Sequence, residues 1–298
     1  MVQQPIPRWL GVVLLLVMAT VFGSNHVAAR VAFEHGANVT TAVAFRSTGT
    51  ALFVLGLLLW HGISLRIPGK TFAHSTFVGL LIAVQSYCLY SAVALIPVAL
   101  ALLVFQTFPM LLALISLLAG GERPSRRTLL AMPVALAGLA LALDVWGKSG
   151  DIAGRWAEVG AGVLWALGAS VSFALALHLI TQWLGGMDGR LRSFLFMSVV
   201  AAVTLIGGAA ADAFALPADA TGWIALALLT VFYGTAITSM FVLLPRLGAV
   251  NNAAVLNFEP IAVLGIAWLV LGQAVAPLQI LGAIIVVGAI MWIGAAGK

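Results

Sequence analysis

The sequence predicts an all-α integral membrane protein of ten transmembrane helices, N-in and C-in, built as two inverted five-helix repeats. Three observations predict this fold: the composition, the spacing of long apolar runs, and a similarity between the two halves of the chain. The 298 residues are 63% hydrophobic and only 8% charged, whereas soluble globular proteins carry about 25% charged residues. No segment is long and polar enough to form a soluble domain, so we expect residues 1–298 to form a single membrane domain.

The apolar runs have the length of membrane-crossing helices. About 20 residues of α-helix cross the roughly 30 Å hydrocarbon core, and charged or turn residues separate runs of this length along the whole chain. The first half contains runs near 9–29, 38–60, 72–94, 97–119 and 127–145. The second half contains runs near 158–182, 191–211, 221–244, 249–271 and 277–296. The joints at Ile96-Pro97 and between Gly272 and Pro277 are so short that they predict antiparallel hairpins.

The basic residues predict the orientation in the membrane. An even number of spans places both termini on one side, and cytoplasmic loops are enriched in Lys and Arg. With a cytoplasmic N-terminus, ten basic residues lie on the cytoplasmic side: Arg8, Arg66, Lys70, Arg123, Arg126, Arg127, Arg190, Arg192, Arg246 and Lys298. Only Arg30, Lys148 and Arg155 lie on the opposite side. We therefore expect a multi-pass protein of a bacterial-type inner membrane with both termini in the cytoplasm.

The two halves, residues 1–148 and 149–298, resemble each other at an offset of about 151 residues. Phe108-Pro109, followed by apolar residues and Gly121-Glu122, aligns with Glu259-Pro260, followed by apolar residues and Gly272-Gln273. A repeat with an odd number of spans enters the membrane from the opposite side the second time, so the halves are predicted to be inverted. Inverted repeats that enclose a central site are frequent among secondary transporters, which favours a carrier that works by alternating access.

These motifs resemble those of the EamA-type transporters of the drug/metabolite transporter superfamily. The resemblance covers essentially the whole chain: Pro109 leads to Gly121-Glu122-Arg123, and Glu259-Pro260 leads to Leu271-Gly272-Gln273. Arg46 matches a position where these proteins commonly carry arginine, whereas Gln273 replaces their usual glutamate. The resemblance implies export of small metabolites. Amino-acid exporters of the YddG type are the most similar group, which implies amino acids, including aromatic or neutral ones, as substrates.

Polar residues within the predicted spans are the candidate substrate-binding residues, because polar groups in hydrocarbon are unfavourable without a partner or a function. In the third run Ser86 and Tyr90 share a helix face, flanked by Gln85 and Tyr87. Aromatic rings with polar tips suit a pocket for an amphipathic zwitterion. The predicted set is Asn25, His26, Gln85, Tyr87, Tyr90, Gln106, Trp165, His178, Tyr233 and Asn257. The alternative is that such groups only bond neighbouring helices to each other.

Charged and titratable residues are few in the spans. Glu259 is the only carboxylate deep in a predicted span, and it needs a cationic partner or a bound proton. It either takes part in proton coupling or, more simply, braces the helix irregularity at Pro260. His26 and His178 occupy similar places in the two halves. Arg46 is expected to extend outward to the membrane interface, which would leave a largely uncharged pocket with loose selectivity.

Other classes of function leave no matching pattern. An intramembrane enzyme would need clustered aspartates or catalytically spaced groups, and the stretch from Gly168 to Ser172 fits helix packing better than a nucleophile turn. A channel would show a repeated polar filter. No catalytic residue, metal site or cofactor is predicted, and Cys88 is the single cysteine. The expected partners are a small-molecule substrate and the lipid bilayer, not nucleic acid, and a monomer suffices.

Glycines recur within the predicted spans. We expect Gly49, Gly56, Gly282 and Gly288 to allow close contact between helices, because a glycine presents no side chain to its neighbour. Any hinge function of these glycines is secondary to this packing role.

Overall fold

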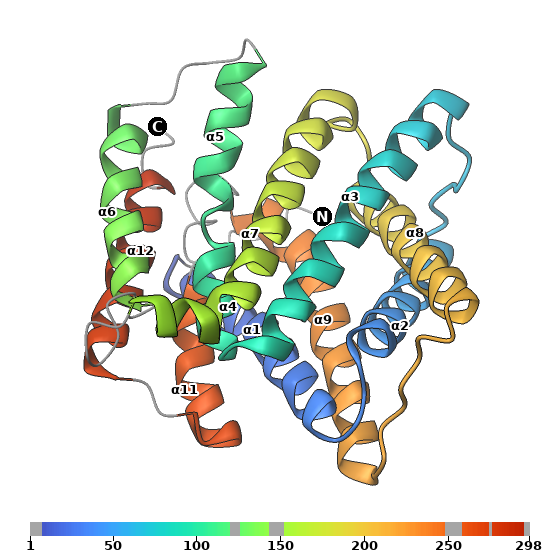
Figure 1. Ribbon diagram of the computed structural model, residues 1–298. Helices are drawn as coiled ribbons and strands as arrows, with labels where there is room; N and C mark the ends of the chain where they lie inside the picture. Colours follow the sequence, from blue (N-terminus) through green and yellow to red (C-terminus); the bar gives the residue numbers. More distant parts are fainter. Residues whose placement is uncertain (1–7, 120–125, 143–151, 248–257, 274–275, 295–298) are drawn as a thin grey trace.

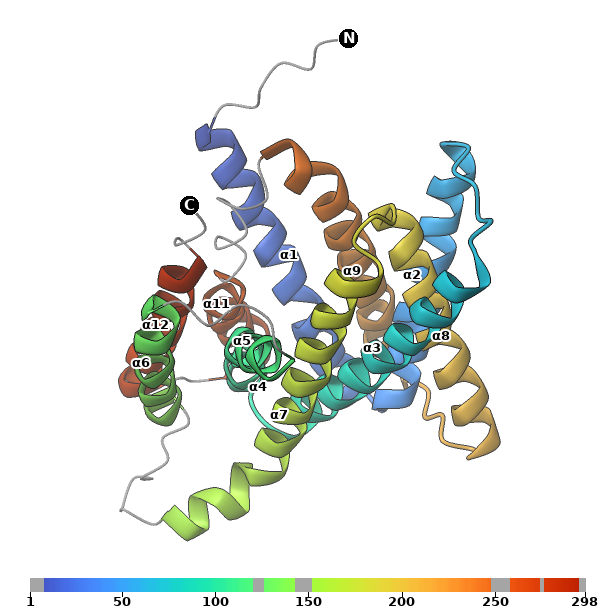
Figure 2. The ribbon, with the colours of Figure 1, turned by 90° about the horizontal axis from the view of Figure 1, so that it is seen from above.

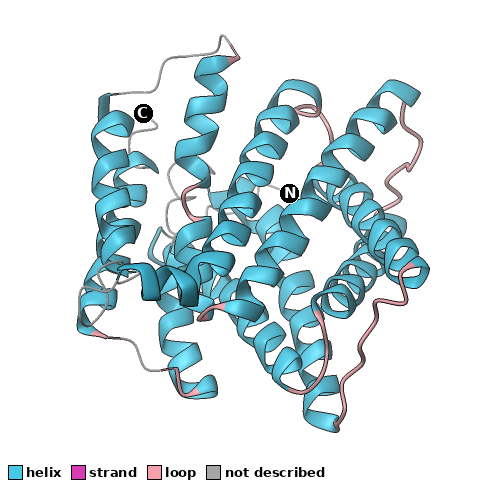
Figure 3. Ribbon diagram, viewed as in Figure 1, coloured by secondary structure: helices cyan, strands magenta, loops and turns pink. Residues whose placement is uncertain are grey.

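The computed structural model describes residues 8–119, 126–142, 152–247, 258–273 and 276–294, and the regular structure within these ranges is helical (Figure 3). The helices of the first half are α1 (Arg8–Glu34), α2 (Val39–Trp60), α3 (Gly69–Leu95), α4 (Val98–Phe105), α5 (Phe108–Leu118) and α6 (Arg126–Ala142) (Figure 1). Those of the second half are α7 (Ile152–Trp183), α8 (Gly189–Ala210), α9 (Ala220–Leu247), α11 (Glu259–Leu271) and α12 (Pro277–Gly294). Each predicted apolar run therefore contains at least one helix.

Most of these helices have the length and composition of membrane spans. Among the described residues, seven helical stretches are long and apolar enough to cross a bilayer, and one of them joins α4 and α5 as Val98–Leu118. The apolar parts of α6, α11 and α12 are shorter, at Pro133–Ala142, Glu259–Leu271 and Pro277–Ala289. Each of the three lies next to residues outside the described ranges. The all-helical membrane fold is thus confirmed, while the count of ten spans stays a prediction.

The break between α4 and α5 follows from Pro109. A proline lacks the N–H that would bond to the carbonyl four residues earlier, here that of Phe105. The hydroxyl of Ser170 on α7 donates to this Phe105 oxygen at 2.9 Å, so the freed carbonyl keeps a hydrogen bond inside the protein. Ser172 likewise donates to the Leu81 oxygen of α3 at 2.7 Å. The segment around these serines therefore serves in helix packing, as predicted.

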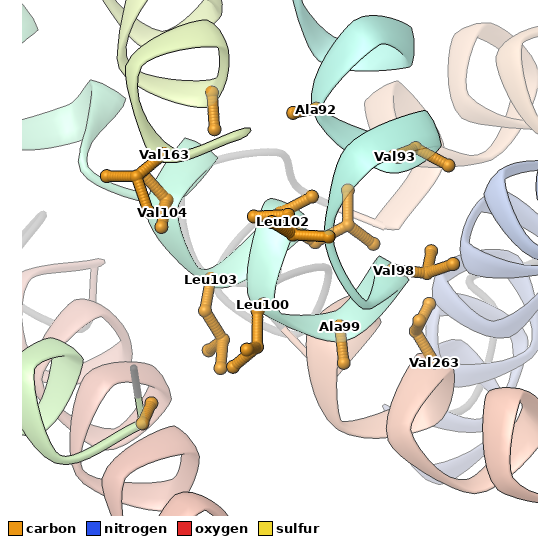
Figure 4. Packing of buried hydrophobic residues seen from close by; sticks show 14 of the residues in the cluster. Ala92, Val93, Val98, Ala99, Leu100, Leu102, Leu103, Val104, Val163 and Val263 are labelled. Atoms are coloured by element: carbon orange, nitrogen blue, oxygen red, sulfur yellow. The ribbon is translucent and has the colours of Figure 1, made fainter. Parts of the chain in front are cut away.

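Helix α4 is the most deeply buried element of the fold. Every residue from Val98 to Val104 is buried, which is expected of a helix that is apolar on all sides. Figure 4 shows these side chains packed among neighbours from other elements, including Val93 of α3, Val163 of α7 and Val263 of α11. This cluster joins elements of both halves of the chain into one core.

The contacts between helices recur with the two halves exchanged. Helix α1 packs against α9 and α11, and in the corresponding places α7 packs against α3 and α5. Helix α2 also contacts α9, as α8 contacts α3. Two pairs lie between equivalent helices, with α6 beside α12 at one end of the molecule and α2 beside α8 at the other (Figures 1 and 2). The helices in corresponding places of the two halves therefore make corresponding contacts.

Two loops from opposite halves are hydrogen-bonded to each other in what we call the loop clasp, residues 35–41 with residues 213–219. Asn38 contributes most to it. Its side chain caps α2 and also donates from Nδ2 to the Ala213 oxygen at 2.7 Å. Its backbone N–H donates to the Ala215 oxygen at 3.3 Å. One residue therefore both starts a helix of the first half and holds the second half in place.

The remaining bonds of the clasp include a pair of titratable groups. Thr41 donates to the carbonyl oxygen of residue 215 at 2.8 Å, and the Ala218 N–H donates to the His35 oxygen at 2.8 Å. Nδ1 of His35 lies 2.7 Å from Oδ2 of Asp219. The N–H of Gly222, followed by the bond from His35, lowers the pKa of the exposed Asp219 carboxyl. The clasp thus contains a carboxylate that stays ionised near neutral pH.

Several loops that were expected on the same side of the membrane lie close to each other. The two loops of the clasp are one such pair. A cavity of about 240 Å³ brings together three further positions expected on that side, namely the Ile96-Pro97 joint, Glu158 and Gln273. At the opposite ends of α2 and α8, Ile63 and Ile67 of the α2–α3 loop pack near Leu191 of α8. The topology of the chain in the membrane stays a prediction.

The four predicted packing glycines divide into two pairs. A Cβ at Gly282 would lie within 3 Å of the α6 backbone at Ala142, and one at Gly49 would clash with the Thr230 side chain. At Gly56 and Gly288 no heavy atom would lie within 4 Å of such a Cβ. The packing role is therefore confirmed for the first pair and wrong for the second, because the sequence does not show which face of a helix meets a neighbour.

Gly282→Ala is expected to lower the free energy of unfolding by about 1 to 3 kcal/mol, because backbone atoms of α6 cannot move aside for the new methyl group. Gly56→Ala is the matched control, and better helix propensity should leave it unchanged or more stable by about 0.5 to 1 kcal/mol. The measurement is the thermal unfolding temperature of both variants in detergent. Equal shifts in the two variants would contradict the proposed close contact of α6 with α12.

Candidate functional site

Polar and aromatic side chains gather at the middle of the molecule, where helices of both halves meet. We call them the central polar cluster: Asn25 and His26 of α1, Arg46 of α2, Ser86 and Tyr90 of α3, Tyr233 of α9 and Glu259 of α11. Asn25 and Tyr90 are completely buried, and Arg46 is 3% exposed. Buried polar and charged groups at membrane depth are rare without a function, so this cluster is the candidate site.

Arg46 lies at the centre of this cluster. Its Nη2 donates to the hydroxyl of Ser86 at 2.7 Å. Its guanidinium carbon lies 4.8 Å from the ring centre of Tyr90 and 4.1 Å from that of Tyr233, distances at which aromatic rings attract a cation. Nε is buried and has no hydrogen-bond partner among the described residues. The two rings come from opposite halves, so the cation sits between them.

The predicted outward extension of Arg46 is wrong. The residue lies seven positions after Val39, the first residue of α2, which is about 10 Å along the helix axis. Its side chain is turned toward the tyrosine rings of α3 and α9 and does not reach the interface. The prediction of a largely uncharged and loosely selective pocket fails with it, because a permanently charged group is part of the site.

Asn25 bonds Tyr90 to helix α1. Its Oδ1 accepts a hydrogen bond of 2.7 Å from the hydroxyl of Tyr90, and its Nδ2 donates to the carbonyl oxygen of Phe22. The Phe22 ring stands edge-on to the ring of Tyr233, with 5.7 Å between centroids. Phe22 was not predicted as a site residue. Its spacing of three residues from Asn25 places both on one helix face and could have indicated it.

Glu259 has a partner that the sequence did not identify. Its Oε1 lies 3.5 Å from Nε2 of His26. The His26 ring lies 5.6 Å from that of Tyr90, and its Nδ1 is buried without a hydrogen-bond partner among the described side chains. Glu259 is also the first residue of α11, just before Pro260, where a negative charge interacts favourably with the helix dipole. Geometry therefore supports both a bracing role and a place in the site.

Four of the predicted residues lie away from the centre of this cluster. Tyr87 and Trp165 are about 40% exposed, with ring centres 6.2 Å apart, and both line an apolar groove of about 490 Å³ along α3 and α8. Nδ1 of His178 lies 3.4 Å from the hydroxyl of Ser116 on α5. Gln106 is buried at the break between α4 and α5.

Gln85 and Asn257 are the two remaining predicted binding residues. Gln85 is partly buried at the edge of the cluster, where its Oε1 accepts a 3.3 Å hydrogen bond from Ser86. Asn257 and the Gly121-Glu122-Arg123 motif lie outside the described residues. The cluster therefore brings together Asn25, His26, Tyr90, Tyr233, Glu259 and Arg46 from the predicted set, with Gln85 beside them.

Tyr90→Phe is expected to lower the free energy of unfolding by about 1 to 3 kcal/mol, because it leaves the buried Asn25 oxygen without its donor. Tyr233→Phe is the control: it keeps a ring against Arg46, and no described residue bonds the Tyr233 hydroxyl. Thermal unfolding in detergent compares the two variants. A loss of stability in Tyr233→Phe as large as that in Tyr90→Phe would contradict the hydrogen bond assigned between Tyr90 and Asn25.

Comparison with known proteins agrees with this architecture. A family model described as the EamA-like transporter family matches residues 9–143 and again residues 160–295. Sixteen chains of solved structures also match. One, titled "Crystal structure of protein", is 19% identical with a TM-score of 0.63 and covers 96% of both chains, a likeness that shows the fold alone. None of the curated proteins compared with the chain matches it.

Proposed function

Because the chain belongs to the EamA-like transporter family, we propose that it exports small zwitterionic metabolites, in particular neutral and aromatic amino acids, by alternating access. Family membership makes it a membrane transporter of small molecules. The observation that carries the finer proposal is the central polar cluster. Its donors, acceptors and rings come from both halves: Asn25, His26, Arg46, Ser86 and Tyr90 are buried, and Tyr233 and Glu259 are partly buried against them.

The chemistry of the cluster fits an amphipathic solute. The rings of Phe22, Tyr90 and Tyr233 offer apolar faces, while Asn25 and Ser86 offer hydrogen-bonding groups beside them. Sites for small molecules combine predominantly apolar walls with a few placed polar groups. A zwitterion with an apolar or aromatic side chain needs both kinds of contact.

The arrangement of the halves fits alternating access. We assign residues 1–148 and 149–298 as inverted repeats, a design in which a central site opens to either side as one bundle rocks against the other. The exchanged helix contacts support this assignment. With N-in and C-in topology in a bacterial-type inner membrane, the loop clasp lies on the outer side. Release of substrate to the outside then requires the clasp bonds between the halves to break.

Counterflow tests the transport proposal. Purified protein in liposomes preloaded with unlabelled phenylalanine or leucine is expected to accumulate the labelled amino acid from outside, with saturation and with dependence on the internal load. Protein-free liposomes are the control. Flux that rises linearly without a counter-substrate would indicate a channel, and chemical conversion of the solute would indicate an enzyme. Either result would contradict the proposed carrier.

Crosslinking the clasp tests alternating access. We expect a disulfide between Asn38→Cys and Ala215→Cys, in a Cys88→Ala background, to reduce counterflow to the level of protein-free liposomes. Residues 38 and 215 already share a backbone hydrogen bond, so the crosslink closes this side of the protein.

Reduction with dithiothreitol should restore counterflow, and Asn38→Cys alone should be insensitive to oxidant. Undiminished exchange by protein whose crosslink is verified by mass would show that the clasp does not open during transport.

A further inference from the structure

We propose that the guanidinium of Arg46 binds a carboxylate group of the transported solute. The inference rests on the proposed transport function and names the chemical group that the central polar cluster selects. It starts from a charge without a counter-charge. Among the described residues, Glu34 pairs with Arg30, Asp188 with Arg190 and Asp219 with His35, while Glu259 lies against His26. None of these carboxyl groups pairs with Arg46.

The absence of a partner carboxylate within the described chain is unusual for this position. An arginine stays protonated at any physiological pH, and a charge at membrane depth is unfavourable unless it is paired or faces a polar path. Arg46 is 3% exposed. The rings of Tyr90 and Tyr233 offset part of this cost through cation–π attraction, but they supply no negative charge. An anion bound during the transport cycle would supply it.

The contacts of the guanidinium leave at least one N–H donor for such an anion. The ring faces use no N–H donor, Ser86 accepts from Nη2, and the Tyr90 hydroxyl is also within hydrogen-bonding reach of the Arg46 side chain. Nε is buried and unbonded within the described structure. A guanidinium binds a carboxylate through two parallel N–H donors, and a free Nε–H is one donor of such a pair. The rings and Ser86 hold the group in a fixed orientation, as a preformed anion site requires.

A carboxyl group lies in the same cluster as Arg46. Glu259 enters the cluster through His26, whose ring packs against that of Tyr90. Carboxyl oxygens accept hydrogen bonds from an ammonium group. Arg46 and Glu259 therefore offer partners for the two ends of a zwitterion.

The anion site is assembled from both halves of the chain. Tyr233 belongs to the second half, whereas Arg46, Ser86 and Tyr90 belong to the first.

The test compares matched inhibitors of counterflow. Labelled phenylalanine is competed by phenylalanine, by phenylalaninamide, which lacks the carboxylate, and by 3-phenylpropionate, which lacks the ammonium group. In the wild type, loss of a charge-assisted hydrogen-bonded contact should make the amide an inhibitor about 10- to 100-fold weaker than phenylalanine. Arg46→Gln should raise the inhibition constant of phenylalanine by a similar factor and raise that of 3-phenylpropionate in parallel. It should leave the inhibition constant of the amide unchanged. Arg66→Gln, at an exposed loop position, is the control and should retain the wild-type ratios.

A second variant covers a failure of Arg46→Gln to fold. Arg46→Lys keeps the positive charge but not the two parallel donors. It should therefore raise the inhibition constant of phenylalanine and leave that of phenylalaninamide unchanged. Equal inhibition of the wild type by phenylalanine and its amide would overturn the carboxylate site while leaving the transport function intact. The carboxylate site would also be overturned if Arg46→Gln or Arg46→Lys kept the wild-type ratio between the inhibition constants of the amide and phenylalanine. Absence of counterflow by the wild type with any amino acid would instead contradict the proposed function.

Discussion

The inability of lipid to solvate polar groups is the constraint on which this structure depends. Every N–H, carbonyl and charged side chain within the bilayer must find its partner in the protein. The freed carbonyl of Phe105 finds the Ser170 hydroxyl, and the oxygen of Asn25 finds the hydroxyl of Tyr90. Each of these bonds joins two helices, so satisfying a polar group also fixes a packing arrangement. Groups left without a partner, such as Nε of Arg46, are then informative about function.

This constraint explains why the candidate site lies between the halves. A polar group at the surface of one bundle is exposed to hydrocarbon unless the other bundle covers it. Tyr233 of α9 and Glu259 of α11 cover Arg46 and His26 of the first half in this way. Because this cover comes from the other half of the chain, the site is complete only where the two halves pack together. Burial of the site therefore depends on contacts between the halves.

The two ends of the helix bundle hold the halves together by different interactions. At one end the loop clasp uses hydrogen bonds and the pair formed by His35 and Asp219. At the other end, around Ile63, Ile67 and Leu191, the contact is apolar packing. Hydrogen bonds exposed to water can exchange with solvent at small net cost, whereas apolar packing is weakened only by exposing its surface. Opening at the two ends therefore breaks chemically different contacts.

The sequence by itself determined the class of fold and the approximate position of the helices, because hydrophobic length responds to the membrane and not to neighbouring helices. It also identified most members of the central polar cluster, since a polar residue in an apolar run stands out. Only the tertiary structure decided which of them meet. It placed His26 beside Glu259 and His178 beside Ser116. It also turned Arg46 inward, and placed Tyr87 and Trp165 along a separate groove. These outcomes depend on the rotation of each helix and on the helix it packs against, and a run of uniformly apolar residues carries little information about either.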